Sequence, residues 1–221
     1  MSKKMDRREL MRKGGLLGLG TMVASSAAAN ECGLATPAQP EGPFYPIESQ
    51  IDTDTDLTYV KNKETSAKGQ RIRVKGRVLD LNCNPVPGAL VEIWQACDSG
   101  KYNHPRDPNP AELDENFQYW GRTHTNAKGE YSFLTIRPGI YPATDSWVRP
   151  AHIHFKAMAP GQPTLTTQMY FADDRYNADD QILNSLTEKQ REIVTVAFSA
   201  AEDSVQEGNF DIYLADTPEL K

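Results

Sequence analysis

The sequence predicts an all-β protein, a single β-sandwich of about eight short strands with long loops. Three observations support this fold class. Apolar and polar residues alternate in several short segments, as they do in half-buried strands. Fifteen Gly and fifteen Pro residues separate these segments with turn signals. The length of 221 residues, with 38% hydrophobic and 24% charged residues, fits one globular domain.

The first 29 residues read as an export signal that is removed from the mature protein. The first 13 residues contain six Lys and Arg, a Gly-rich apolar stretch follows, and residues 27–29 (AAA) offer a cleavage site. The stretch is too short and too rich in Gly to be a spanning helix, so we expect no membrane span after its removal. The adjacent Arg7 and Arg8 resemble the bacterial twin-arginine signal, with an ordinary Sec signal as the alternative. The sequence therefore predicts an exported protein, either periplasmic or extracellular.

The remaining chain is acidic and poor in cysteine. After residue 29 it contains 18 Lys and Arg against 28 Asp and Glu, which argues against nucleic acid or an anionic membrane as a partner. Its cysteines are Cys32, Cys83 and Cys97, and their spacing is not that of a zinc site. An oxidising compartment would allow one disulfide, but the sequence leaves the pairing open.

The pattern changes at residue 71. Residues 30–70 lack apolar periodicity, and we expect an N-terminal arm that lies over the domain and is anchored at residues 42–46 (GPFYP). Residues 71–221 form the predicted sandwich, in which residues 178–191 are the one segment with helical character. The first predicted strand begins at Arg71, where Ile, Val and Gly alternate with basic residues. A hairpin loop is predicted at 126–129. The other predicted strands are 89–94, 119–125, 131–135, 149–158, 164–172, 193–199 and 210–214.

Two of the four histidines, His152 and His154, lie two residues apart on a predicted strand. Both imidazoles would therefore project from the same face, which is the nucleus of a metal site because neutral imidazole is the commonest metal ligand. A pair of exposed strand histidines gives the same pattern. A third histidine or a carboxylate, which zinc enzymes and iron(II) oxygenases use, does not lie close to the pair in sequence.

Two tyrosines in predicted loops complete a different ligand set. Tyr102 follows Gly100-Lys101, and Tyr141 follows Gly139-Ile140. A loop tyrosine alone is usually an amphipathic surface residue. Two phenolates and two imidazoles, however, suit a hard trivalent ion, because a Lewis-acidic metal lowers the pKa of a phenol and the phenolates offset the metal's charge.

Five stretches of the sequence form a specific set of motifs: EGPFYP at 41–46, VEIWQA to GKY at 91–102, GRT to GIYP at 121–142, RPAHIHF at 149–155 and QMYF at 168–171. Together they resemble the intradiol ring-cleavage dioxygenases, those of the protocatechuate 3,4-dioxygenase type in particular, over about residues 37–175. The resemblance implies an enzyme that uses O2 and iron(III) to open a catechol-type ring between its two hydroxyls, giving a cis,cis-muconate-type diacid.

The resemblance also implies roles for individual residues. The iron(III) ligands would be Tyr102, Tyr141, His152 and His154. Tyr141 would leave the metal when the catechol binds. Arg149 would stabilise negative charge that develops on the ring, and Gln168 would be a polar group of the pocket beside it.

Some features depart from the family, and other functions compete. Ala143 stands where protocatechuate enzymes have a tryptophan, and Val148 separates Trp147 from Arg149, so the identity of the catechol substrate stays open.

The alternative function is a non-catalytic secreted β-sandwich of the transthyretin-like, carbohydrate-binding kind, because the strand–turn–strand at 71–94 is also similar to such modules. A periplasmic copper or zinc protein is less favoured, since no Cys or Met ligand lies near the histidine pair. The sequence leaves open whether the protein is a homo-oligomer.

Overall fold

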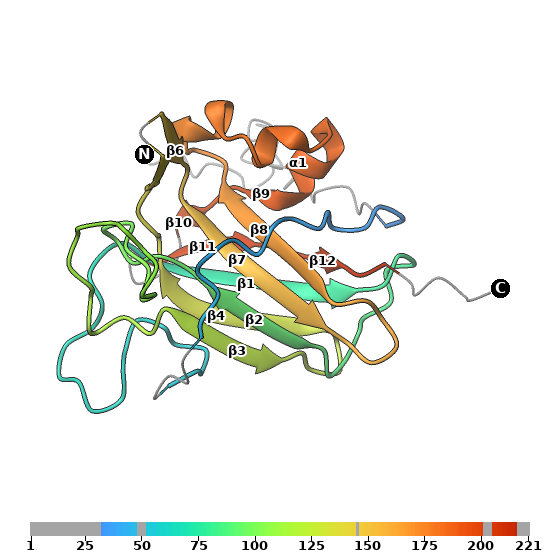
Figure 1. Ribbon diagram of the computed structural model, residues 1–221. Helices are drawn as coiled ribbons and strands as arrows, with labels where there is room; N and C mark the ends of the chain where they lie inside the picture. The colour runs from blue at the N-terminus through green and yellow to red at the C-terminus, as the bar shows by residue number, and fades with distance from the viewer. Residues whose placement is uncertain (1–31, 48–51, 145, 201–204, 216–221) are drawn as a thin grey trace, which may run out of the picture. The chain divides into compact units, whose positions relative to one another are not determined.

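The computed structural model describes residues 32–47, 52–144, 146–200 and 205–215 of the chain. Two five-stranded sheets dominate this part (Figure 1), and the predicted β-sandwich is confirmed. The export signal predicted at residues 1–29 lies outside the described residues. Within them, no helix is both long and apolar enough to cross a membrane.

The first sheet is built around one long strand. Strand β1 pairs in antiparallel fashion with β4, and its other edge pairs in parallel with β11 and β12, while β10 continues the sheet beyond β11. The bounds of these strands are β1 Arg71–Leu79, β4 Glu130–Ile136, β10 Ser199–Ala200, β11 Gln206–Asn209 and β12 Ile212–Tyr213.

The second sheet carries the histidine pair on its central strand. Its order is β3-β2-β7-β8-β9, and a separate two-stranded sheet is formed by β5 and β6. The bounds of these strands are β2 Leu90–Trp94, β3 Trp120–His124, β5 Tyr141–Thr144, β6 Trp147–Arg149, β7 His152–Met158, β8 Leu165–Phe171 and β9 Thr195–Val196.

Alternating apolar residues from both sheets form one core. On β1, Ile72, Val74 and Val78 are fully buried, and they belong to the same cluster as Ile93 of β2 and Phe155 of β7. Burying a side chain of this size stabilises the fold by about 1.5–3 kcal/mol. The period-two pattern in the sequence therefore reports the inner face of each sheet.

Several connections differ from the sequence-based prediction. The loop at 126–129 is a turn as expected, but β3 and β4 on either side belong to different sheets, so it is not a hairpin. The strand predicted at 149–158 is broken after Arg149, because Pro150 has no N–H to donate to a ladder. Strands β5 and β11 were not predicted. The predicted helical segment consists of two 3₁₀ turns, η1 (Arg175–Asp179) and η2 (Leu183–Ser185), and one short helix, α1 (Glu188–Val194).

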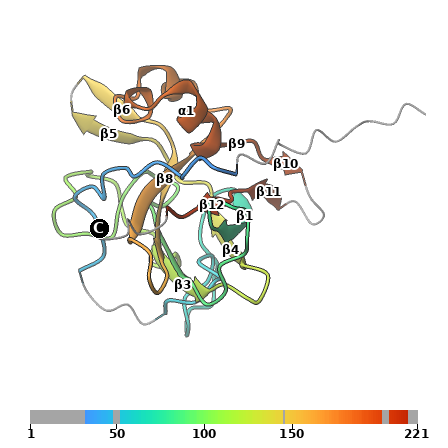
Figure 2. The ribbon, with the colours of Figure 1, turned by 90° about the vertical axis from the view of Figure 1, so that its right-hand side faces the viewer.

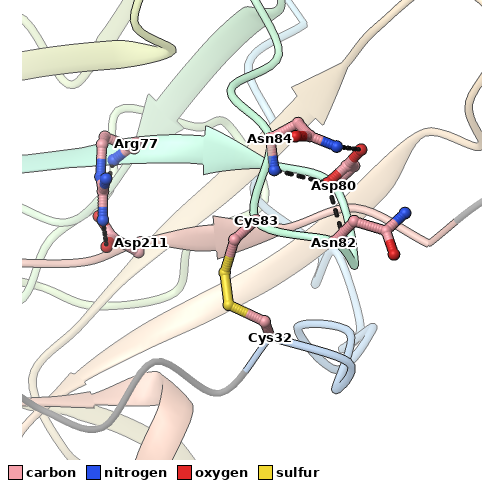
Figure 3. Close-up of a disulfide and its surroundings, with 7 residues drawn as sticks. All are labelled: Cys32, Arg77, Asp80, Asn82, Cys83, Asn84 and Asp211. Carbon is pink, nitrogen blue, oxygen red and sulfur yellow. Dashed lines mark hydrogen bonds and ion pairs between the residues drawn. A yellow bond between two sulfur atoms is a disulfide. The ribbon is translucent and has the colours of Figure 1, made fainter.

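The N-terminal arm runs along the second sheet next to β8 (blue in Figure 2). The Gln39 N–H donates to the carbonyl of Thr166 (2.9 Å), and the Thr167 hydroxyl donates to the carbonyl of Pro37 (2.8 Å). A disulfide between Cys32 and Cys83 ties the start of the described arm to the turn after β1 (Figure 3), with Cα atoms 5.5 Å apart. Cys97 is free and buried.

Candidate metal centre

The loops that carry the two tyrosines cross each other at two glycines. The N–H groups of Gly100 and Gly139 both donate to the carbonyl of Cys97, at 2.9 and 3.0 Å. A Cβ added at Gly100 would lie 2.1 Å from the Ile140 carbonyl oxygen, and one added at Gly139 would lie 2.4 Å from the Asp98 carbonyl oxygen. Because only glycine lets the two backbones approach so closely, these positions bring Tyr102 and Tyr141 together.

The two histidines project from one face of β7, as their spacing predicts. Their ring centroids are 5.0 Å apart, and both side chains are buried. His152 Nδ1 lies 2.7 Å from the carbonyl of Pro150, which assigns the ring proton to Nδ1 and leaves a lone pair on Nε2. His154 is stacked on Trp94, its cross-strand partner on β2, at 4.8 Å and an interplanar angle of 10°. Both imidazoles are therefore fixed in orientation.

The four side chains meet in one place. Tyr102 Oη lies 3.2 Å from His152 Nε2, the Tyr102 ring is 5.9 Å from that of Tyr141, and it is 6.2 Å from that of His154. Two ligand atoms bound at a right angle to one ion, each at about 2.1 Å, lie about 3 Å apart, close to the separation between Tyr102 and His152. The Nδ1 of His154 is buried without a hydrogen-bond partner in the described structure.

Burial sets the protonation of these groups. Burial, followed by the charge of Arg149, lowers the pKa of His154 to about 3, and burial with the same arginine holds the pKa of His152 well below its ordinary value. Both imidazoles are thus neutral and able to bind a metal at neutral pH. Burial raises the pKa of Tyr102 and Tyr141, so each phenol keeps its proton until a metal displaces it.

The phenols are indispensable to any such site. In the described ranges, no group of three or more His, Cys, Asp or Glu side chains could hold a metal ion. A two-His, two-Tyr set provides two nitrogen and two oxygen ligands, and a hard trivalent ion matches it better than copper(I) or zinc, which favour thiolates and imidazoles.

Arg149 and Gln168 lie against this cluster. Arg149 Nη1 is 3.2 Å from His152 Nε2, and Arg149 Nη2 donates to Gln168 Oε1 at 2.9 Å. Gln168 in turn donates through Nε2 to the carbonyl of Pro40 in the arm (2.8 Å). All six side chains singled out in the sequence therefore lie in one contiguous group.

The arm covers the tyrosine side of the cluster. The Phe44 ring lies 4.8 Å from that of Tyr102 and 5.4 Å from that of Tyr141. A Cβ at Gly42, whose φ is +74°, would lie 3.5 Å from His154. The arm is thus a wall of the site as well as a strap across β8.

Sequence reasoning missed two further residues of the site. Tyr170 donates to Gln39 Oε1 (2.9 Å) and accepts from Arg149 Nη2 (3.1 Å). It lies two residues after Gln168 on β8, so the same period-two argument that paired the histidines could have found it. Asp180 forms an ion pair with Arg149 at 3.0 Å and has no local signal in the sequence.

Comparison with known proteins identifies relatives of this chain. A family described as Dioxygenase matches residues 40–216. The protocatechuate 3,4-dioxygenase beta chain of Burkholderia cepacia is 42% identical over 181 residues, which cover 78% of this chain and 76% of that one. The catechol 1,2-dioxygenase of Candida albicans is 31% identical over 180 residues, 76% of this chain and 57% of its own length, so the chain spans little more than half of that relative.

Solved structures agree with these relatives. The dioxygenase domain of a dioxygenase carbohydrate-binding protein fusion from Streptomyces sp. SirexAA-E superposes with a TM-score of 0.64 at 32% identity, over 83% of this chain and 99% of that domain. The 3-chlorocatechol 1,2-dioxygenase of Rhodococcus opacus 1CP superposes with a TM-score of 0.65 at 21% identity, over 82% of this chain and 72% of that one, and shows that the fold is shared.

Proposed function

The chain belongs to the intradiol dioxygenase family, and from that membership we propose that it opens a catechol-type ring between its two hydroxyls, with iron(III) and O2, to a cis,cis-muconate-type diacid. The observation that carries the proposal is the meeting of two phenols and two neutral imidazoles beside a buried arginine. A non-catalytic sandwich needs none of these five side chains.

The residues that would hold iron(III) are Tyr102, Tyr141, His152 and His154. When bound there, the metal would act as a Lewis acid that binds the catecholate and draws electron density from its ring. The protein's part is to keep both imidazoles neutral and fixed, which burial, the Pro150 carbonyl and the stacking of Trp94 accomplish.

Tyr141 is suited to leave the metal when substrate arrives. It is partly exposed, whereas Tyr102 is only 3% exposed. Burial and the nearby Asp107 raise the pKa of the Tyr141 phenol, so a Tyr141 that did not bind the metal would hold a proton at Oη, and a catechol hydroxyl would be able to supply it.

Arg149 supplies the positive charge for the reacting ring. Its guanidinium is buried beside the histidines, where a fixed charge stabilises developing negative charge more strongly than in water. The arm, with Phe44 over both tyrosines, limits access of water to this side of the site.

Spectroscopy and product analysis test the proposal together. Purified protein loaded with ferric iron should be red-brown, because two phenolates on one iron(III) give a broad charge-transfer band, and catechol added without oxygen should shift that band. With ¹⁸O₂, mass spectrometry should find both labelled atoms in a ring-opened diacid. A colourless protein that stays inactive after reconstitution with iron would refute the enzyme function.

Export is a separate proposal that residues 1–29 support by sequence alone. The Cys32–Cys83 disulfide is typical of an oxidising compartment. Copper and zinc bind nitrogen ligands more tightly than iron(II) does, so loading iron before export is an advantage that the twin-arginine route provides. Changing Arg7 and Arg8 to Lys should leave active, coloured, uncleaved enzyme in the cytoplasm, and export at the normal rate would show a Sec-type signal instead.

A further inference from the structure

Asp180 contacts the Nε and Nη2 side of the Arg149 guanidinium, whereas His152 lies near Nη1. It follows η1 in the chain and is completely buried, and the Arg149 side chain is 7% exposed. The guanidinium donates through Nε to Asp180 Oδ2 at 3.0 Å and through Nη2 to Oδ1 at 3.4 Å. Removing two charges from water is costly, so such a pair persists where its remaining polar atoms are also satisfied.

The donors of Arg149 divide into two groups. Nε–H is directed at Asp180, and the two Nη2 hydrogens face three acceptors, which are Asp180 Oδ1, Gln168 Oε1 and Tyr170 Oη. Nη1 alone is directed toward the candidate ligands, where it lies 3.2 Å from His152 Nε2. One edge of the guanidinium is therefore held by the protein, and the other edge is presented to the site.

Gln168 and Tyr170 do not hold the Nε side of Arg149. Both come from β8 and both accept from Nη2, and neither of these bonds involves Nε. Asp180 adds the Nε contact and a negative charge that compensates the buried cation.

We propose that Asp180 is a positioning residue for the ring-opening reaction, one that sets the plane of Arg149 so that Nη1 faces the substrate. This inference rests on the proposed function. The competing role for Asp180 is purely structural, because its Oδ1 also accepts from the Leu183 N–H at 2.7 Å and so shapes the loop between η1 and η2.

Asparagine is a sharp test of the carboxylate. Both oxygens of Asp180 accept from N–H donors, one from Arg149 Nε and one from the Leu183 N–H. In either orientation of an asparagine side chain, its NH₂ group would therefore face one of these donors and could not accept from it. We therefore expect Asp180→Asn to lose the hold on Nε or to disturb the Leu183 contact, with little change in side-chain volume.

A double-mutant cycle separates positioning from loop structure. In the iron-loaded enzyme, Asp180→Asn should lower kcat/KM for catechol by about 10- to 100-fold, since a misplacement of about 1 Å has that effect, while the iron content stays the same. In an Arg149→Ala background the same change should alter kcat/KM by less than about twofold, because the group it positions is gone. Asp173→Asn is the matched control, since it breaks a bidentate Arg–Asp pair with Arg137 on the surface, and it should stay within about twofold of wild type.

Urea unfolding of the four proteins of the cycle (wild type, Asp180→Asn, Arg149→Ala and the double variant) without metal gives a readout independent of turnover. Asp180→Asn should lower the midpoint more in the wild-type background than in the Arg149→Ala background, because only the former leaves an uncompensated buried charge. Equal fold-losses of kcat/KM in both backgrounds, or equal shifts of the urea midpoint in both, would overturn the positioning role. A wild-type enzyme with iron but without ring cleavage would instead refute the proposed function.

Discussion

Gly100→Ala tests the crossing of the two tyrosine loops, on which the candidate metal centre depends. Gly100 has a φ of +78°, and an added Cβ would lie 2.1 Å from the carbonyl oxygen of Ile140, the residue before Tyr141. Ordinary contact needs about 3.5 Å, so the Ile140 carbonyl must retreat by more than about 1 Å and carry Tyr141 away from Tyr102. The substitution should therefore disturb the tyrosine pair as well as the fold.

Gly161→Ala is a matched control for the backbone strain. Gly161 has a φ of +76°, and apart from its own residue and its two chain neighbours no atom lies within 4 Å of an added Cβ. Both variants should lose about 1–2 kcal/mol of unfolding free energy from an alanine with positive φ. Gly100→Ala should lose about 1–3 kcal/mol more from the clash, because well-packed atoms resist displacement.

Thermal unfolding of the metal-free proteins and titration with ferric iron measure the two effects. Each kcal/mol should lower Tm by about 2–4 °C in a domain of this size. The Gly161→Ala protein should keep the visible band of the iron-loaded wild type, and the Gly100→Ala protein should lose most of it. If the two variants match in Tm and in colour, the loops do not cross as described and the tyrosines do not meet in this way.

Three further predictions follow from the same geometry. Tyr102→Phe and His154→Ala should each lose most of the bound iron in metal analysis, whereas Tyr141→Phe should keep more of it; full iron in all three variants would place the metal elsewhere. Arg149→Ala should lower turnover about a hundredfold at unchanged iron content, since one lost charge contact to a transition state costs roughly 3 kcal/mol; near-normal steady-state kinetics would leave this arginine a structural role only. The metal-free protein should lose stability as the pH falls from 6.5 towards 3, because burial and then Arg149 lower the pKa of folded His154 to about 3 while the unfolded chain binds that proton near 6.5. The unfolding free energy lost through His154 approaches about 5 kcal/mol near pH 3, at about 1.4 kcal/mol per pKa unit, and none of it is lost above pH 6.5. If unfolding free energy falls equally steeply with pH in His154→Ala, this reasoning is wrong.

Much of the fold could be predicted because the strands and their buried faces depend on patterns among residues close together in the sequence. Alternation along β1 predicts which residues face the core, and the same alternation places His152 and His154 on one face of β7. The break between β6 and β7 was also readable, since Pro150 cannot donate to a ladder, but the prediction of one continuous strand overlooked it. Sheet membership was not readable, because a turn such as 126–129 looks the same whether its strands pair with each other or with different partners.

The cysteine pairing shows the same limit. Three cysteines allow three pairings, and nothing in their spacing favours one of them. The structure brings Cys32 to 5.5 Å from Cys83, within the range of a disulfide, and buries Cys97 as a free thiol.

The sequence by itself determined the residue types of the candidate site, because two histidines at period two and two tyrosines beside loop glycines are local features. The tertiary structure alone decided that they meet and what holds them. Tyr102 and His152 are 50 residues apart in the chain, Arg149 and Asp180 are 31 apart, and Tyr170 and Gln39 are 131 apart. Contacts between residues so far apart produce no periodic pattern in the sequence, since they depend on how the loops and sheets pack in the folded chain. Asp180 is the clearest case: its sequence context is that of an exposed turn, and only the packing of the segment after η1 against Arg149 makes it a buried partner of the site.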